Sequence, residues 1–250
     1  MSRALYPIAG LRFWSEKEIQ QREQAIGRLA GCVERTLLDL NQSWRLERVE
    51  APVIMPLAGF SDAYEADDVF SLRREMNAET WALRAETTPG SYLYAKHLLQ
   101  ATSVKPPLCV WQAGLSFRTE AADGATAAKL RFNAFYQLEF QCIYRADSHA
   151  DYATALRDAL TDELSAITGQ ATRQIPSDRL PSYATETIDI EGLWAPAPGQ
   201  TEFKEIASTS RRTDFPVFDP YQGTTPKNTL TVFEVAIGLD RVVALSNQEA

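Results

Sequence analysis

The sequence lacks any uninterrupted apolar run of the ~18–20 residues that a membrane-spanning helix requires. Between Arg3 and Ser15 it has only a short, mixed apolar stretch, so it also lacks the long apolar core of a secretory signal. Both absences predict a cytoplasmic protein that does not associate with a membrane.

Cysteine and histidine are scarce, with three and two copies in 250 residues. Cys32, Cys109 and Cys142 are odd in number and far apart, which argues against a disulfide framework and against a Cys-x-x-Cys metal site. His97 and His149 are too few for a histidine-built zinc site. We therefore expect three buried thiols and two ordinary histidines.

Basic residues are outnumbered, because 25 Lys and Arg face 33 Asp and Glu and give a formal net charge of −8. This excess disfavours a protein that coats nucleic acid nonspecifically. A local basic groove remains open, with Arg211–Arg212 and Lys129–Arg131 as candidates. The 45% hydrophobic and 10% aromatic content excludes disorder as the main state. No repeat or linker is visible, so we expect a single domain over residues 1–250.

Local patterns predict helices and strands in an α+β order. Ser15-Glu16-Lys17-Glu18 has the form of a capping box, and the apolar spacing that follows predicts a helix from about Glu16 to Asn41. A strand is expected over residues 44–54, where Pro52 restricts it to an edge, an end or an interface. The other expected strands are 81–84, 108–118, 135–144, 185–190, 202–208 and 230–236, and the other expected helices are 91–99, 151–167 and 239–247.

The order of these elements indicates the type of sheet. Segments 108–118 and 135–144 predict a long antiparallel hairpin, and Ala195–Gly199 predicts a loop. Because strands and helices do not alternate regularly, the sheet is expected to be mainly antiparallel.

Carboxylates and arginines recur at the ends of the expected strands. A polar strand face of this kind is costly to bury unless it binds something. Any single member is more often half of a weak surface ion pair than part of a site. The set comprises Arg84, Glu86, Arg118, Glu120, Arg131, Asp189, Glu191, Glu205, Glu234 and Arg241.

Three segments together resemble the signature motifs of class II aminoacyl-tRNA synthetases. Phe117-Arg118-Thr119-Glu120, followed by a loop and Arg131–Glu139, resembles motif 2, near residues 115–144. Gly238-Leu239-Asp240-Arg241 resembles motif 3, near residues 230–247. The long helix and the strand with Pro52 are similar to motif 1, near residues 16–56, the dimerisation element. The resemblance implies an antiparallel sheet flanked by helices, one catalytic domain and a homodimer.

Within that class the chain looks most like glycyl-tRNA synthetase. Leu83-Arg84-Ala85-Glu86-Thr87 resembles the family's Leu-Arg-Pro-Glu-Thr, and Tyr183–Glu191 resembles its Tyr-Ala-x-Asp-x-Trp-Asp-x-Glu. Lys204–Thr213 is similar to its Glu-Cys-x-Gly-x-x-Asp-Arg-Ser segment, and Phe233–Gly238 to its Ile-Glu-Pro-Ser-x-Gly. The blocks follow one order over roughly residues 45–245.

The resemblance implies that the protein activates an amino acid with ATP and releases pyrophosphate. Arg118 would hold the α-phosphate and Arg241 the γ-phosphate, while Phe135 would stack on the adenine. Glu120 would read the adenine edge or the amino acid, and Arg131 would also belong to the nucleotide site. The chemistry needs orientation and charge stabilisation without a covalent protein intermediate.

The ammonium group of the amino acid needs carboxylates around it. The resemblance places Glu86, Glu120 and Glu234 there, with Asp189 on the same face. Such a pocket suits glycine or another small amino acid. Ala236 stands where the family has a pocket serine, which leaves the exact amino acid open.

Further features concern the metal and the acceptor. Mg²⁺ would bridge phosphate oxygens, with Glu191 and Glu205 as its carboxylate ligands. The loop 121–130 lacks the family's second arginine, for which Lys129 is a substitute. Only nine residues follow Arg241, so an anticodon-binding domain is not expected.

Three functions remain open on the sequence. The first is an adenylate-forming ligase that loads glycine or a similar amino acid onto a tRNA, a carrier protein or a small molecule. The second is a non-catalytic synthetase paralogue that serves as a regulatory or accessory subunit, because motif 2 and the pocket are altered. The third is an unrelated α+β domain whose ion pairs mimic the motifs. Retention of Arg118, Glu120, Phe135 and Arg241 favours the first.

Overall fold

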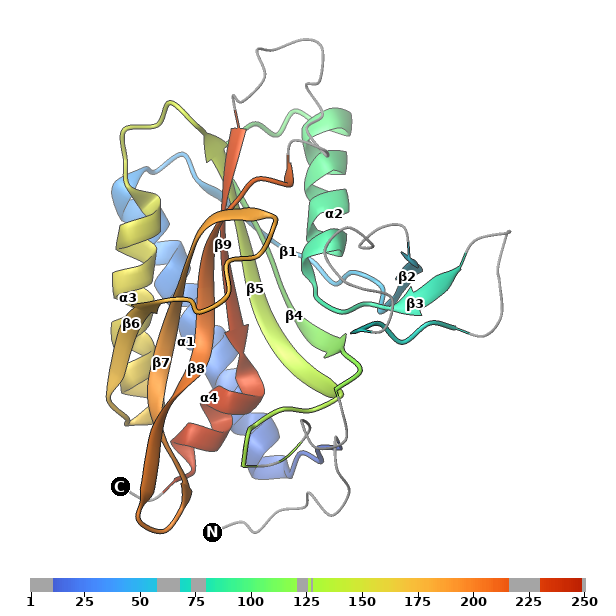
Figure 1. Cartoon of the computed structure of the whole chain (residues 1–250). Coiled ribbons are helices and arrows are strands. Elements are labelled where there is room, and N and C mark those ends of the chain that lie inside the picture. Colours follow the sequence, from blue (N-terminus) through green and yellow to red (C-terminus); the bar gives the residue numbers. More distant parts are fainter. Residues whose placement is uncertain are drawn as a thin grey trace.

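The structure is a computed structural model that describes residues 11–57, 68–72, 80–120, 126, 128–215 and 230–248. Figure 1 shows its helices and strands arranged around one large sheet. In chain order the elements are α1 (Glu16–Leu40), β1 (Arg45–Arg48), β2 (Ile54–Pro56), β3 (Trp81–Leu83), α2 (Thr88–Ala101), β4 (Leu108–Phe117), β5 (Ala134–Arg145), α3 (Tyr152–Thr168), β6 (Thr172–Pro176), β7 (Ala184–Ala197), β8 (Gln200–Arg212), β9 (Leu230–Gly238) and α4 (Leu239–Ser246).

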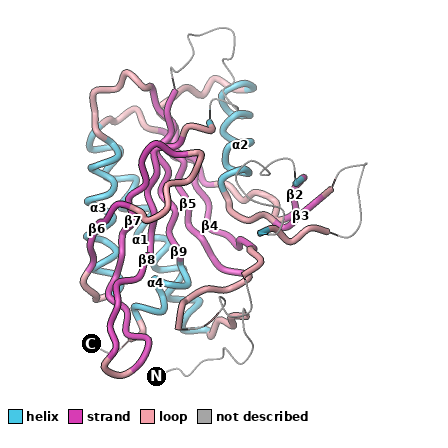
Figure 2. Tube along the Cα trace, viewed as in Figure 1, coloured by secondary structure: helices cyan, strands magenta, loops and turns pink. Residues whose placement is uncertain are grey.

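The main sheet has seven strands in the order β1-β4-β5-β9-β8-β7-β6. Strands β1 and β4 are parallel and the other neighbours are antiparallel. The long hairpin of β4 and β5 is confirmed, with Leu108 opposite Ile143 and Phe117 opposite Ala134. Strands β2 and β3 form a separate two-stranded sheet to one side (Figure 2). The expected α+β fold with a mainly antiparallel sheet and flanking helices is therefore confirmed.

Helix α1 begins where the capping box predicted. The Ser15 hydroxyl accepts a hydrogen bond from the Glu18 backbone N–H, and the Glu18 carboxylate accepts one from the Ser15 backbone N–H. The apolar stripe of α1 is buried with α3, α4 and one face of the sheet, and it includes Ile26, Leu29, Val33 and Leu37.

The strands divide their side chains between two faces of different character. On β5, Leu138, Phe140 and Cys142 belong to the core under α1, α3 and α4. The alternate residues Glu139 and Gln141 therefore point to the opposite face. Helix α2 packs on part of that opposite face through a second apolar cluster, which leaves the polar strand residues beside its N-terminus. This division determines where the candidate site lies.

Two expected elements differ from the structure. The expected strand over 44–54 is divided between β1, at the edge of the main sheet, and β2, which begins at Ile54 in the small sheet. Pro52, which lies between them, has no N–H to continue a ladder. The expected loop Ala195–Gly199 is mostly strand, because β7 reaches Ala197 and a turn containing Gly199, at φ +75°, leads into β8.

The cysteines agree with the expectation of buried thiols. Cys32, Cys109 and Cys142 are all buried and free. Cys109 and Cys142 face each other across β4 and β5, with their Sγ atoms 3.8 Å apart. No helix within the described ranges combines the length and the apolarity needed to cross a membrane.

Candidate active site

The strand register builds a polar floor on the sheet face beside α2. Residues paired across adjacent strands form two neighbouring rows, one across five strands and one across four of them. The side chains of both rows lie on this face. The first row is Gln112, Glu139, Ala236, Ser208 and Asp189, and the second is Gln141, Glu234, Ser210 and Thr187. Glu234, Ala236 and Asp189, which the sequence assigned to the amino acid pocket, thus lie in adjacent rows of one surface.

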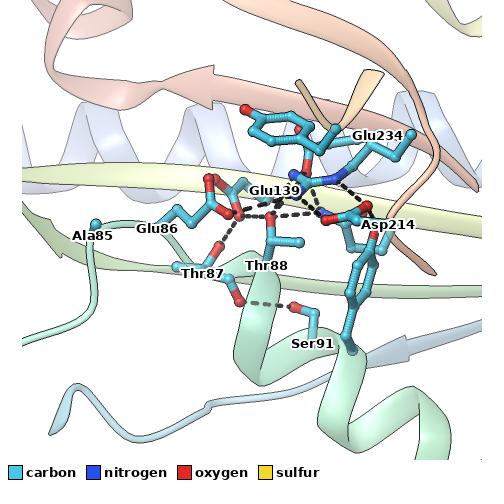
Figure 3. Close-up of polar contacts among 12 residues, drawn as sticks. Ala85, Glu86, Thr87, Thr88, Ser91, Glu139, Asp214 and Glu234 are labelled. Carbon is cyan, nitrogen blue, oxygen red and sulfur yellow. Dashed lines mark hydrogen bonds and ion pairs between the residues drawn. The ribbon is translucent and has the colours of Figure 1, made fainter. Parts of the chain in front are cut away.

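Four carboxylates and one guanidinium gather over this floor, and we call them the carboxylate cluster: Glu86, Glu139, Asp214, Glu234 and Arg212 (Figure 3). Arg212 contacts Glu234 directly, lies 2.6 Å from Asp214 and 3.7 Å from Glu86. The Arg212 side chain is 1% exposed, so its pairs with the buried Glu86 and Glu234 are shielded from water, whereas Asp214 is partly exposed. The members come from β5, β8, β9 and the segments before α2 and after β8, and folding alone brings them together.

Hydroxyl groups at the start of α2 and an amide group on β5 complete the cluster. Thr88 Oγ1 lies 2.8 Å from a Glu234 oxygen and 3.1 Å from a Glu139 oxygen, and the Thr87 hydroxyl also donates to Glu139. The Gln141 amide donates to Glu234 over 2.7 Å, while its buried Oε1 has no hydrogen-bond partner among the residues that the structure describes. The N-terminus of α2, which favours anions, therefore points at the carboxylates.

Tyr183 covers the cluster from the segment before β7. Its ring centroid lies 3.9 Å from the Arg212 guanidinium carbon. Burial raises the pKa of the Tyr183 hydroxyl, and Glu86 and Glu234 add to this, while Arg212 and Arg118 oppose it. Charges from the carboxylate cluster and from Arg118, the residue predicted to hold the α-phosphate, therefore both act on the Tyr183 hydroxyl.

The cluster holds a proton at neutral pH. Burial, with the charges of Glu234 and Glu86, raises the pKa of Glu139 to about 8, although the Thr87 hydroxyl and Arg212 oppose this. Burial alone would lower the pKa of Arg212, but Glu234, Tyr92 and Glu86 reverse the effect and raise it above its ordinary value. Arg212 therefore stays charged and Glu139 is the group that titrates near neutrality.

The predicted nucleotide residues lie at the far end of β4 and β5. The Arg118 guanidinium carbon is 5.2 Å from the centre of the Phe135 ring, and its Nε donates to the Ala85 carbonyl over 3.1 Å. Arg131 lies 3.7 Å from Glu120 and is about half exposed. A flat ring with an arginine above it is a suitable platform for a base next to its phosphates.

Arg241 and the two predicted metal ligands lie on neighbouring elements. Arg241 lies in the first turn of α4, and its Nη1 is 2.8 Å from the Glu205 carbonyl and 3.2 Å from the Glu205 carboxylate. Glu191 faces Glu205 across β7 and β8 and is paired with Arg173 at 2.7 Å. Among the residues that the structure describes, no three His, Cys, Asp or Glu side chains are grouped so that they could hold a metal ion. Two carboxylates and water are a set that Mg²⁺ can take, and here each carboxylate is paired with an arginine, Glu191 with Arg173 and Glu205 with Arg241.

Asp189 lies deeper in the floor. It is 7% exposed, and burial raises the pKa of its carboxyl, while hydrogen bonds from the Ser177 and Ser208 hydroxyls counteract this. Ala236 lies between Glu139 and Ser208 in the same row. Its methyl group makes it the smallest side chain among its neighbours there.

Three arginines have surroundings other than those the sequence suggested. Arg84 is buried and donates to the backbone carbonyls of Leu115 and Ala51, so it joins the small sheet to β4. The basic groove proposed at Arg211–Arg212 is wrong, because Arg212 is buried among carboxylates and Arg211 pairs with Glu186 and Asp151. Neighbouring carboxylates therefore balance the charges of Arg211 and Arg212.

The sequence missed several members of the carboxylate cluster. Glu139 was quoted only as part of motif 2, yet Gln137, Glu139 and Gln141 alternate with apolar residues on β5, a period-two signal that could have identified it. Arg212 was matched to an arginine of the family but given no role. Asp214 has no pattern of its own, because its position depends on how the chain leaves β8.

Comparisons with known proteins support the fold. No family model matches the chain, and no curated protein matches it. Among solved structures, a prolyl-tRNA synthetase from Cryptosporidium parvum, in complex with halofuginone and AMPPNP, superposes with a TM-score of 0.69 at 13% identity over 97% of this chain. A Giardia lamblia prolyl-tRNA synthetase in complex with prolyl-adenylate gives a TM-score of 0.70 at 16% identity over 98% of this chain. The chain spans about half the length of each, 48% and 49%. It therefore has the fold of the catalytic domain of class II aminoacyl-tRNA synthetases, as the motifs predicted.

Proposed function

We propose that the protein is an adenylate-forming ligase that activates glycine, or another small amino acid, with ATP and transfers it to an acceptor. The observation that carries the proposal is the carboxylate cluster, in which three buried carboxylates and the partly exposed Asp214 lie around one guanidinium. A purely structural cluster with so many acids would be costly, because buried charges need matching partners. An ammonium group bound there would supply the missing positive charge.

The positions of these residues also agree with one orientation of the bound amino acid. Arg118 lies over the Phe135 ring, and its charge acts on the hydroxyl of Tyr183, the residue next to the carboxylate cluster. An amino acid with its ammonium in the carboxylate cluster would present its own carboxylate toward Arg118 and the α-phosphate. Arg118 would then stabilise the charge that builds on the α-phosphate as pyrophosphate leaves. Glu120 and Arg131 extend this side, and Arg241 would hold the γ-phosphate.

Mg²⁺ belongs to the same proposal. Glu191 and Glu205 are the residues that would hold it, and the ion would neutralise phosphate oxygens of ATP. Arg241 contacts Glu205, so the γ-phosphate arginine and one metal ligand are adjacent.

Glycine is favoured over proline by the sequence blocks, whereas the solved neighbours named above are prolyl enzymes. The carboxylate cluster agrees with this preference, because a substrate without a side chain must bind through its ammonium. The acceptor is a tRNA, a carrier protein or a small molecule, and the active form is a homodimer through α1 and the strand that follows it.

A regulatory subunit remains the second candidate, favoured by one observation. Arg131 is about half exposed and lies at the end of a motif 2 loop that lacks the family's second arginine. The protein would therefore bind ATP more weakly than a family member that has both arginines. Such a protein would bind a partner rather than turn over ATP.

Amino-acid-dependent exchange of pyrophosphate into ATP tests the proposal, with glycine, alanine, serine and proline run beside the other amino acids. We expect exchange with one small amino acid. Folded protein that gives no exchange with any amino acid would contradict the proposal and favour the regulatory subunit.

A matched pair of variants links the activity to the site. Arg118→Ala should lower exchange by about 100-fold or more while the protein stays folded, because a charge-stabilising group is lost. Arg28→Ala removes an arginine whose 2.7 Å ion pair with Glu163 lies on the surface of α1, and it should leave exchange unchanged. An unfolded Arg118→Ala protein would point to a structural role instead.

A further inference from the structure

A second buried ion pair lies away from the carboxylate cluster, where α1, β5 and α4 meet. Asp240, in the first turn of α4, is 3% exposed, and Arg12 approaches it from the segment before α1. Arg12 Nε lies 3.1 Å from Asp240 Oδ1, and its Nη1 lies 3.4 Å from the Asp240 carbonyl. Both side chains are at most 4% exposed, so this contact is protected from water and salt.

Asp240 also replaces a missing strand partner. The ladder between β5 and β9 ends at the pair Gln137 and Gly238, because the chain turns into α4 there. The next backbone N–H along β5, that of Tyr136, donates instead to Asp240 Oδ2 over 2.6 Å. One carboxylate therefore joins the end of β5 to the first turn of α4.

Arg12 is itself held firmly in place. Its Nη2 lies 3.4 Å from Glu18 Oε1, whose other oxygen caps α1. Its guanidinium carbon lies 4.0 Å from the centre of the Trp14 ring and 5.6 Å from that of Phe132. An unbroken series of contacts thus runs from the cap of α1 through Arg12 and Asp240 to β5.

This series of contacts matters because two of its residues are next, in the sequence, to residues proposed to bind ATP. Asp240 precedes Arg241, and Tyr136 follows Phe135, so the carboxylate connects the residues proposed for the γ-phosphate and the adenine. Burial raises the pKa of Asp240 to about 6, which Arg12 opposes, and the carboxylate is therefore mostly ionised at neutral pH.

We propose that Arg12 is a positioning residue that acts through Asp240 to fix α4 relative to β5, and so sets the spacing of the two ends of the ATP site. The inference rests on the proposed function for its consequence, but its geometry is independent of that function. Neither residue is expected to touch ATP or the amino acid.

Steady-state pyrophosphate exchange tests the consequence with the full chain. Arg12→Gln should raise the KM for ATP about tenfold, because the buried ion pair that holds Asp240 is lost, and leave the KM for glycine and kcat within about twofold. A merely structural role would reduce the active fraction and hence kcat, with both KM values unchanged. Arg28→Gln, which loses an exposed ion pair on α1, should match the wild type in all three values.

Asp240→Asn serves as the second variant and covers the case in which Arg12→Gln does not fold. It should raise the KM for ATP as Arg12→Gln does, and the double variant should be no worse than the more affected single variant, because the two residues act through one contact. Additive effects, or a wild-type KM for ATP in either folded variant, would overturn the inference.

Amide hydrogen exchange separates this inference from the proposed function. In Arg12→Gln, the N–H of Tyr136 and those of the first turn of α4 should exchange at least tenfold faster than in the wild type, and in Arg28→Gln they should not. This result would support the positioning contact even if the wild type shows no pyrophosphate exchange, in which case only the proposed function fails. Unchanged amide exchange in Arg12→Gln would overturn the positioning contact itself.

Discussion

Glu139→Gln should change how the stability of the protein depends on pH. The wild-type carboxyl is 1% exposed, and its pKa rises from 4.5 to about 8 on folding, because of burial and then the charges of Glu234 and Glu86. Below pH 4.5 both the folded and the unfolded chain carry this proton. Between pH 4.5 and pH 8 the unfolded chain has lost it and the folded chain keeps it, so the wild type loses stability as pH rises.

The size of the effect follows from this shift. Each pH unit within that window costs the wild type about 1.4 kcal/mol of unfolding free energy, or about 4 kcal/mol between pH 5 and pH 8. Glutamine keeps the shape of the protonated acid and has no proton to lose. The variant should therefore be similar to the wild type at pH 5 and more stable by several kcal/mol at pH 8. Asp240, which titrates near pH 6, is present in both proteins and cancels in the difference.

Urea unfolding followed by tryptophan fluorescence at pH 5, 6, 7 and 8 measures this difference. A stability difference that is the same at every pH would refute the reasoning, since it would mean that Glu139 does not hold a proton in the folded protein. A difference that falls with pH would show that the carboxylate is stabilised by Arg212 more than it is penalised by burial.

Two further predictions rest on the structure, and a third rests on the resemblance to motif 1. Arg212→Leu should lose about 3–5 kcal/mol of stability, because three carboxylates are left without their buried counterion, and a loss under about 1 kcal/mol in urea unfolding would contradict the ion-pair geometry. Gly114→Ala should lose about 1–3 kcal/mol, since its Cβ would lie 2.3 Å from the buried Arg84 Nη2, whereas Gly27→Ala, with nothing within 4 Å, should be neutral or stabilising in the same assay. Sedimentation should show a dimer at micromolar concentration, and a monomer would count against an interface built from α1 and the strand that follows it.

Periodicity and capping residues predicted most of the main sheet and its helices correctly. The capping box at Ser15 and the alternation in 135–144 are local signals, and the structure follows them closely. Strand β6 was missed because Thr172–Pro176 has no apolar alternation and pairs only with β7. The division at Pro52 was missed because the sequence does not indicate which sheet each half joins.

Only those site residues that lie in a motif or in an alternating strand pattern could be predicted from the sequence. Glu86 and Glu234 lie in recognisable segments, and the structure brings both to Arg212. The contact of Thr88 with Glu234 joins residues far apart in the sequence, which no local pattern encodes, and that of Asp214 with Arg212 depends on how the chain leaves β8. The contact of Arg12 with Asp240 likewise forms only because α4 lies beside the segment that precedes α1.

A structure of the protein with glycine and AMPPNP tests the central claim most directly. We predict that the glycine ammonium lies within hydrogen-bond distance of Glu86 or Glu234, and that the adenine stacks on Phe135 with Arg118 at the α-phosphate. Crystals soaked at millimolar concentration in which the carboxylate cluster holds no amino acid, or in which the nucleotide binds elsewhere, would contradict the claim that this cluster is the amino acid pocket of an adenylate-forming enzyme.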